Sequence, residues 1–358
     1  MSKKIAAKKG ILVRQLKIII LLISKYIGLF SLSRKLTSNG LRILCYHGFT
    51  NSDESLFRPK LFITERLFKQ RLEKISKMGF SVISLDKAVS MLESGVVPEN
   101  SIVITVDDGW LGVESIAWPL LKEYKFDWTL YLTTYYAEKQ TQVMNVAIQY
   151  LCWKAQKGEY DFSTLEGFNR TIIQLKNEAD SDFLTQDLIK FGEQLPNASA
   201  TQKFVECVAD IFNKEQSLFD QSNMFYIIGM KTAGLMSADG VDIQLHTHRH
   251  TLGGTSKTAL NKELTDNKNS IQKTTEKRLV HFCFPSGYYE NMHLSWLKEQ
   301  GIISATTCKP GLNYSNTPLL ELNRFLDGEN ISAIEFEAEL SGFTELLRKS
   351  RSFFKMAS

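Results

Sequence analysis

The sequence predicts an α/β protein built on a mostly parallel sheet or barrel. From residue 41 onward, short apolar segments alternate with segments of helical spacing, which is the pattern of βαβ units. Residues 101–106 are apolar and rich in β-branched side chains, which is typical of a buried strand. Between about residues 138 and 231 the alternation stops and the chain looks mainly helical. This stretch indicates an insertion packed over one face of the sheet.

The individual elements follow from local periodicity. In residues 65–78, for example, apolar side chains recur at helical spacing on one side. Strands are predicted at residues 42–46, 80–84, 101–106, 128–133, 241–245, 279–284, 302–306 and 319–323. Helices are predicted at residues 65–78, 86–93, 112–124 (disturbed by Pro119), 143–157, 165–191 (with interruptions), 201–219, 257–275, 292–299 and 332–356 (broken at Gly342).

Composition limits the classes of function. Of the 358 residues, 43% are hydrophobic and 23% are charged, as in soluble globular proteins, and the net charge of +4 gives no indication of a nucleic-acid partner. The five cysteines are odd in number and form no C-x-x-C pair. A disulfide framework is therefore not expected, and a reducing, cytoplasmic location is favoured.

The first 38 residues differ from the rest in their charge pattern. Six basic residues precede the apolar run 18–23, which is shorter than the roughly 20 residues of a spanning helix. No small-residue cleavage site follows it. We therefore predict a basic amphipathic helix at residues 1–38 that lies in an anionic membrane surface, at the inner face of the membrane. The alternative is a first helix that packs on the domain with its basic ends in water. The polar stripe on its helical wheel comprises Arg14, Lys17, Ser24, Lys25, Gly28 and Ser31.

Two adjacent carboxylates, Asp107 and Asp108, end the strand predicted at residues 101–106, and Gly109 follows them. Burying two like charges side by side is costly, and a metal ion or another cation relieves that cost. The plain alternative is a strand followed by an ordinary Asp-Asp-Gly turn.

Three of the six histidines lie together at His246, His248 and His250, directly after the strand predicted at 241–245. Strand ends of a parallel α/β fold share one face, and active sites collect there. His246 and His250 are four residues apart, so a single turn after the strand directs both side chains to the same position. Two imidazoles with a carboxylate form a common catalytic zinc set, which also accepts other first-row metals. The alternative is a polar surface turn that is rich in histidine.

These stretches resemble the polysaccharide deacetylase family, the NodB-homology or carbohydrate esterase group. Thr105–Gly109 (TVDDG) resembles the family's T-F/V-D-D-G motif, and His246–His250 (HTHRH) resembles its H-S/T-x-x-H motif. Residues 284–288 (FPSGY) resemble the P-x-G motif of one groove wall, and residues 44–47 (LCYH) resemble the Y-H opening of circularly rearranged members. The resemblance covers about residues 40–330, with the insertion unmatched. It departs from the family at Cys283, where many members have the arginine that orients the catalytic base.

The resemblance implies a distorted (β/α) barrel of about seven units that hydrolyses the N-acetyl group of an amino sugar. It further implies that Asp108, His246 and His250 hold a divalent metal, zinc before other first-row metals, and that Asp107 is the general base. The predicted general acid is His47. Arg324 is predicted to pair with Asp107 in place of the missing arginine. Pro285, Ser286 and Gly287 are expected to line the substrate groove, with backbone N–H groups near Ser286 and Gly287 donating to the oxyanion.

The expected organisation has three parts: the N-terminal helix at 1–38, the deacetylase barrel at 39–330 with its insertion at about 138–231, and a C-terminal helix at 331–358. The expected substrate is a cell-surface polysaccharide or its lipid- or nucleotide-linked precursor. The precursor is favoured, and the insertion is expected to form a cap that fits an acceptor smaller than a long polymer. One alternative is a non-catalytic glycan-binding or scaffold protein that retains the barrel. Another is removal of a formyl rather than an acetyl group.

Overall fold

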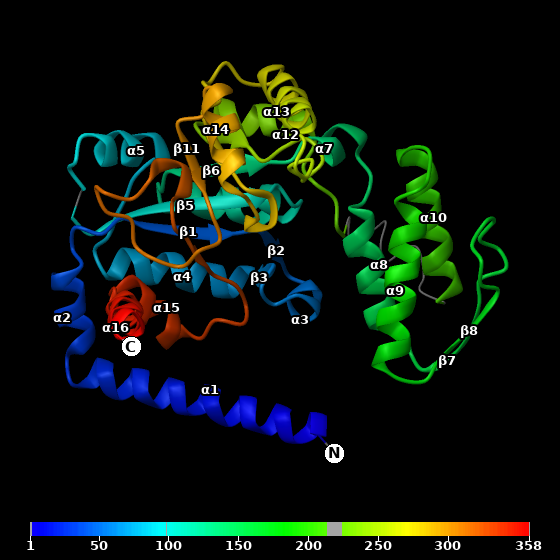
Figure 1. The fold of residues 1–358 in the computed structure, drawn as a ribbon, viewed down its shortest axis with the longest axis horizontal. Helices are drawn as coiled ribbons and strands as arrows, with labels where there is room; N and C mark the ends of the chain where they lie inside the picture. The colour runs from blue at the N-terminus through cyan, green and yellow to red at the C-terminus, as the bar shows by residue number, and fades with distance from the viewer. Residues whose placement is uncertain (1, 98, 213–223, 358) are drawn as a thin grey trace.

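The computed structural model describes residues 2–97, 99–212 and 224–357 and contains a curled parallel sheet at its centre (Figure 1). The middle strand, β5 (Ser101–Asp108), is buried along its whole length, as expected for a parallel strand covered on both faces. β4 (Ser81–Val82) pairs with β5 beside the main path. The strand order is β11 (Ser304–Thr306), β10 (His281–Cys283), β9 (Asp242–Leu245), β6 (Trp128–Leu132), β5 (Ser101–Asp108), β1 (Arg42–Tyr46) and β12 (Phe325–Leu326).

The two edges of the sheet are joined by the segment that precedes β12. Leu322 forms a parallel bridge with Thr306 of β11, and Phe325 pairs with Leu44 of β1. The strand predicted at residues 319–323 is therefore wrong. Pro318 begins a 3-10 turn, η3 (Leu319–Glu321), and the pairing with β1 starts only after Arg324. The sheet is thus a distorted (β/α) barrel closed by irregular backbone, which confirms the predicted fold class.

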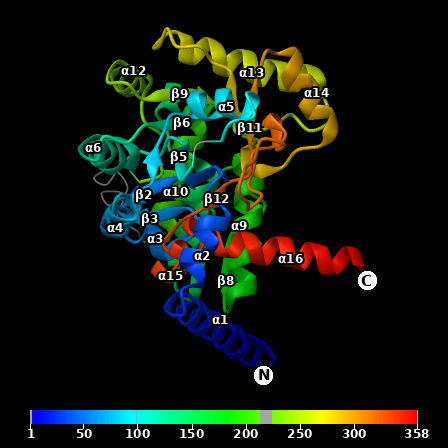
Figure 2. The same ribbon diagram turned by 90° about the vertical axis from the view of Figure 1, so that its left-hand side faces the viewer.

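Helices surround the sheet (Figure 2) and bury their apolar faces in one large core, except α5 (Leu85–Glu93), whose apolar face packs in a second cluster with residues of β1 and β5. The predicted helix at 112–124 is divided: Val113–Ala117 form a π-helical turn, η1, and Pro119 lies in the first turn of α6. The covering helices are α4 (Glu65–Lys77), α5 (Leu85–Glu93), α6 (Trp118–Glu123), α12 (Met230–Ala238), α13 (Lys257–Gln272) and α14 (Asn291–Glu299). Short elements near the strand ends are β2 (Gly48–Thr50), α3 (Glu54–Phe57), β3 (Phe62–Thr64) and η2 (Pro285–Gly287).

The insertion stands to one side of the barrel, on the right in Figure 1. Its predicted helix over 165–191 is wrong in the first half, where two strands pair in antiparallel fashion instead. The helix α9 begins only at Glu178, because the Asn177 side chain and Asp180 form a capping box there. The last residues of the helix predicted at 201–219 lie outside the described residues. The elements are α7 (Tyr135–Lys139), α8 (Met144–Lys154), β7 (Gly158–Asp161), β8 (Ile172–Leu175), α9 (Glu178–Gly192) and α10 (Ala198–Ile211).

The N-terminal region is two helices rather than one, because Gly28 breaks it with a positive φ of 84°. The helices are α1 (Ser2–Tyr26) and α2 (Leu29–Leu36). In the described part of the chain no single helix is long and apolar enough to cross a membrane, whereas α1 from Leu12 and α2 reach that length and composition as a pair bent by 78°.

The C-terminal region also consists of two helices, α15 (Ala333–Leu340) and α16 (Phe343–Ala357). They are broken at Gly342, as predicted. Its φ is 74°, and a Cβ there would lie 2.0 Å from the Thr37 hydroxyl. Glycine is therefore required where α15 and α16 meet the end of α2.

Candidate active site

The predicted site residues come from four strand ends that meet at one edge of the sheet. Asp107 and Asp108 end β5, His246 follows β9, His47 follows β1, and Ser286 lies just beyond β10. Only β6 separates β5 from β9, so their ends are close in space. These residues and His250 line a cavity of about 360 Å³. Pro285 and Gly287 were also predicted to line the groove, but of this turn only Ser286 lines the cavity, and Arg324 does not line it.

Asp108, His246 and His250 form a compact set of potential metal ligands. The Asp108 Oδ1 atom lies 3.2 Å from His246 Nε2 and 3.4 Å from His250 Nε2. Asp108 Oδ1 is buried and has no hydrogen-bond partner among the described residues. An ionised oxygen without a donor is expensive to bury, whereas a cation between the three atoms satisfies it. These residues therefore fit a divalent metal ion.

The tautomer of His246 supports the same conclusion. Its Nδ1 lies 2.9 Å from the carbonyl oxygen of Cys283, and a carbonyl oxygen only accepts, so Nδ1 carries the proton. In the neutral ring, Nε2 then presents a lone pair to the Asp108 carboxylate. Burial opposes charge on His246, but interactions with Cys283 and Asp108 outweigh it and raise the pKa of His246. A proton and a metal ion therefore compete for Nε2.

Residues behind the ligands hold them in place. The Trp110 indole donates to Asp108 Oδ2 at 2.8 Å, which fixes the carboxylate plane. The Asn267 amide oxygen accepts from the backbone N–H of His246 at 3.0 Å. Such partners orient metal ligands and tune their affinity. Sequence reasoning missed these roles, although Trp110 directly follows the Asp-Asp-Gly motif.

The backbone at the site adopts conformations that non-glycine residues rarely take. Asp108 has φ 68°, His250 φ 57° and Ser286 φ 56°. Left-handed backbone costs energy for such residues and collects at functional sites. Gly109, at φ 92°, is required for a second reason, because a Cβ there would lie 2.5 Å from the side chain of Leu132. Glycine is therefore required at position 109, in the turn after β5.

Asp107 is held by Arg324, and the predicted contact is present. Two parallel hydrogen bonds join them, Nη1 to Oδ1 at 2.7 Å and Nη2 to Oδ2 at 2.8 Å, and both side chains are buried. Burial alone would raise the pKa of Asp107, but Arg324 and His47 outweigh it and lower the pKa far below its ordinary value. Asp107 is therefore ionised throughout the physiological pH range.

Arg324 fills the space beside Cys283 and Asp107. Its Nη2 lies 3.1 Å from the Cys283 Sγ atom, and the Cys283 thiol is 3.3 Å from Asp107 Oδ2. Two further bonds, to the Thr307 carbonyl at 2.9 Å and the Thr105 hydroxyl at 3.1 Å, fix the guanidinium. Because the Cys283 side chain is short, it leaves room beside Asp107 for the guanidinium of Arg324, which comes from the segment before β12.

His47 and the turn after β10 complete the cavity. His47 Nε2 lies 3.6 Å from Asp107 Oδ2, and its ring is largely buried. The Gly287 N–H donates to the Phe284 carbonyl at 2.9 Å, so it is not free for an oxyanion as predicted. Pro285 has no N–H, which leaves that of Ser286 at the cavity wall. His248 turns away from the ligands to the Thr134 hydroxyl at 2.8 Å.

One segment of the chain matches a known protein family. Residues 203–304 match the sequence profile of the family described as Polysaccharide deacetylase. No curated protein matches the chain significantly.

Three solved structures share the fold. The Streptococcus pyogenes deacetylase PplD, in complex with acetate, is 17% identical with a TM-score of 0.55, over 84% of this chain and 98% of its own. IcaB from Ammonifex degensii is 15% identical with a TM-score of 0.53, over 86% and 97%. A de-N-acetylase from Aggregatibacter actinomycetemcomitans is 14% identical with a TM-score of 0.52, over 84% and 99%. Residues 203–304 therefore match a polysaccharide deacetylase family model, and the chain as a whole shares the fold of these three structures.

Proposed function

We propose that this protein is a metal-dependent hydrolase that removes N-acetyl groups from an amino sugar of a cell-surface polysaccharide or its lipid- or nucleotide-linked precursor. The observation that carries the proposal is the unpartnered Asp108 Oδ1 opposite two imidazole nitrogens. The ligand set of one carboxylate and two imidazoles suits zinc first and also accepts other first-row metals.

The roles of the residues follow from the chemistry of amide hydrolysis. When bound, a divalent ion polarises the acetyl carbonyl and lowers the pKa of the attacking water. Asp107 accepts the proton of that water, and Arg324 keeps its carboxylate ionised and oriented. The Ser286 N–H donates to the oxyanion of the tetrahedral intermediate. His47 donates a proton to the leaving amine, so that the sugar departs as a free amine and acetate is released.

Metal removal tests this function. We expect the purified protein to contain one zinc or other first-row ion per chain, to lose acetate release after chelation, and to regain it when the ion is restored. The measurements are metal analysis by mass spectrometry and acetate release from N-acetylated sugars. Formate release from N-formylated sugars distinguishes the acyl group. Stoichiometric metal with no hydrolysis of any acylamino sugar would instead favour the glycan-binding alternative.

The N-terminal helices support contact with a membrane, although not in the way the charge pattern predicted. Lys17 and Lys25 pair with Glu335 and Glu337 of α15, at 2.7 and 2.8 Å. The basic stripe therefore faces the protein, and apolar side chains of α1 face outward. The outward residues, each more than half exposed, are Leu12, Val13, Leu16, Ile19, Ile20, Leu22, Ile23 and Tyr26. As part of the proposal, this apolar face lies in the inner leaflet of the membrane and places the enzyme on the cytoplasmic side.

Vesicle flotation tests the membrane contact. We expect the protein to float with neutral phosphatidylcholine vesicles, because burial of apolar surface drives binding. Leu16→Glu together with Ile20→Glu is expected to abolish flotation, because both side chains lie on the outward face. Leu235→Glu, at an equally exposed leucine of α12, is the matched control and keeps binding. Binding that survives the double substitution, or that requires anionic lipid, would contradict this mode of attachment.

A further inference from the structure

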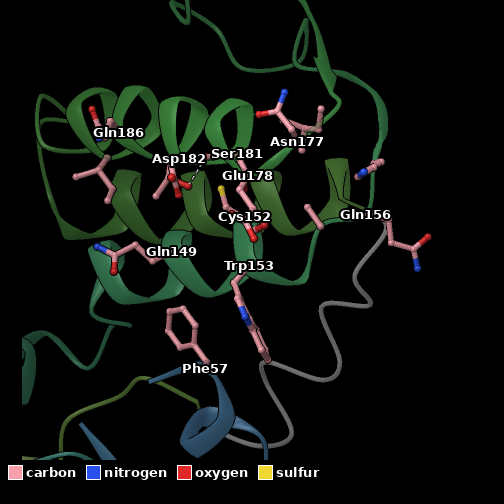
Figure 3. A pocket seen from close by; sticks show the side chains of 15 residues that line it. Phe57, Gln149, Cys152, Trp153, Gln156, Asn177, Glu178, Ser181, Asp182 and Gln186 are labelled. Atoms are coloured by element: carbon pink, nitrogen blue, oxygen red, sulfur yellow. Dashed lines mark hydrogen bonds between the residues drawn. The ribbon is translucent and has the colours of Figure 1, made fainter. Parts of the chain in front are cut away.

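A second cavity, of about 790 Å³, opens between α8 and α9 in the insertion (Figure 3). We call it the insertion groove. Side chains of Ser181 and Asp182 lie on its α9 side, Gln149 and Trp153 on its α8 side, and Phe57 of α3 stands at its rim. The insertion therefore presents a groove of its own, in addition to the residues of α8 that line the catalytic cavity.

The insertion groove is continuous with the catalytic cavity along one face of α8. Asn145 lines the catalytic cavity, Gln149 lines both cavities, and Trp153 lines the insertion groove. These residues are spaced by four, so they share one helical face. With a rise of 1.5 Å per residue the track is about 12 Å long, which exceeds one sugar ring. Beside this face of α8, Arg58 lines the catalytic cavity and Phe57 lines the insertion groove.

The groove offers an aromatic face that is ready for stacking. Trp153 is 46% exposed, which is unusual for so large an apolar side chain. Its ring centroid lies 5.5 Å from that of Phe57, which holds it from one side. The neighbouring Lys154 is tied to Asp53 at 2.5 Å. Tyr150 also packs against the Trp153 ring, with centroids 5.8 Å apart, and the Lys154 ammonium lies over the ring at 5.6 Å from its centroid. The ring is thus held in place while nearly half of the side chain stays exposed, which suits stacking on the apolar face of a pyranose.

Polar groups beside the ring complete a sugar site. The side-chain amides of Asn145 and Gln149 form no hydrogen bond with any described residue, so their donors and acceptors are available. Charged side chains in the groove are two carboxylates, Glu178 and Asp182, and one lysine, Lys157. This balance disfavours a phosphate group and suits neutral or amino sugars.

We infer that the insertion groove binds further sugar units of the glycan whose N-acetyl group enters the catalytic cavity. The preferred substrate is then an oligomer or polymer of amino sugars rather than a single nucleotide-linked sugar. This inference rests on the proposed function, because the catalytic cavity must hold one unit of the same chain.

The test compares acceptors of different length. The probes are N-acetylglucosamine and its soluble β-linked oligomers, and the variant is Trp153→Ala. We expect about a tenfold fall in kcat/KM for long oligomers, carried by KM with kcat unchanged, and no change for the single sugar. Phe183→Ala is the matched control, because Phe183 is an exposed aromatic of α9 that lines a different cavity.

Direct binding separates this inference from the proposed function. Calorimetric titration of the wild type and Trp153→Ala with the longest oligomer is expected to show the same tenfold weakening. If no acceptor releases acetate but binding of the oligomer still depends on Trp153, the proposed function is overturned and the sugar groove stands. If acetate is released but Trp153→Ala behaves as wild type with every acceptor length, or weakens all lengths equally, the groove inference is overturned.

Discussion

Replacing His246 by alanine is expected to remove the bound metal and to lower acetate release by on the order of a thousandfold. His246 supplies the nitrogen nearest to Asp108 Oδ1, at 3.2 Å, and its ring is almost wholly buried. Without it, one carboxylate and one partly exposed imidazole remain, which is too small a set to retain zinc. Metal analysis and acetate release measured on the same sample check both parts.

The matched control for this prediction is His248→Ala. His248 lies in the same His-x-His-x-His stretch, but its Nδ1 contacts the Thr134 hydroxyl and it belongs to no ligand group among the described residues. We expect this variant to keep its metal and its turnover. If His246→Ala and His248→Ala lost metal and turnover to the same extent, the cause would be damage to the loop after β9 and not the loss of a metal ligand.

Replacing Arg324 by methionine is expected to have the second-largest effect. Asp107 would lose both of its short hydrogen bonds while remaining buried. Removing one partner of a buried ion pair costs about 3–5 kcal/mol of the free energy of unfolding. The same change raises the pKa of Asp107, because burial then acts without its counterion.

The direction of the pH effect follows from linkage. In the wild type the lowered pKa of Asp107 contributes stability above its unfolded pKa, and this contribution is lost as the pH falls through the folded value. In Arg324→Met that contribution is absent near neutral pH, and the acid limb of kcat/KM moves to higher pH. Arg324→Lys is the control, because it keeps the charge but not the two parallel hydrogen bonds. If Arg324→Met had the turnover of the wild type and the same acid limb of kcat/KM, Arg324 would be excluded as the partner of the general base Asp107.

Much of the barrel could be predicted from local pattern. The run 101–106 is mostly apolar and β-branched, which indicates a buried strand. The acids and histidines follow strands that lie close together in a parallel sheet, so they meet at the same edge. Arg324 was predicted because the family resemblance implies an arginine that orients Asp107, and Cys283 stands in the place of that arginine. The strand and its end residues follow from periodicity and charge, which the sequence displays directly, whereas the prediction of Arg324 depends on the family resemblance.

The errors occur where distant contacts decide local structure. Residues 319–323 have strand composition, but the edge of β11 takes only one bridge from them and the pairing with β1 begins at Phe325. The lysines of α1 were assigned to lipid because the acids of α15 that bind them lie more than 300 residues away. The Gly287 N–H was predicted to be free, because a turn's internal hydrogen bond to Phe284 leaves no mark in the sequence.

The most direct test of the central claim is anomalous scattering from a crystal of the protein soaked in zinc. The account predicts a single strong peak within coordination distance of Asp108 Oδ1, His246 Nε2 and His250 Nε2, and loss of that peak in His246→Ala. A crystal with no peak there, or with an ion bound at other residues, would contradict the account.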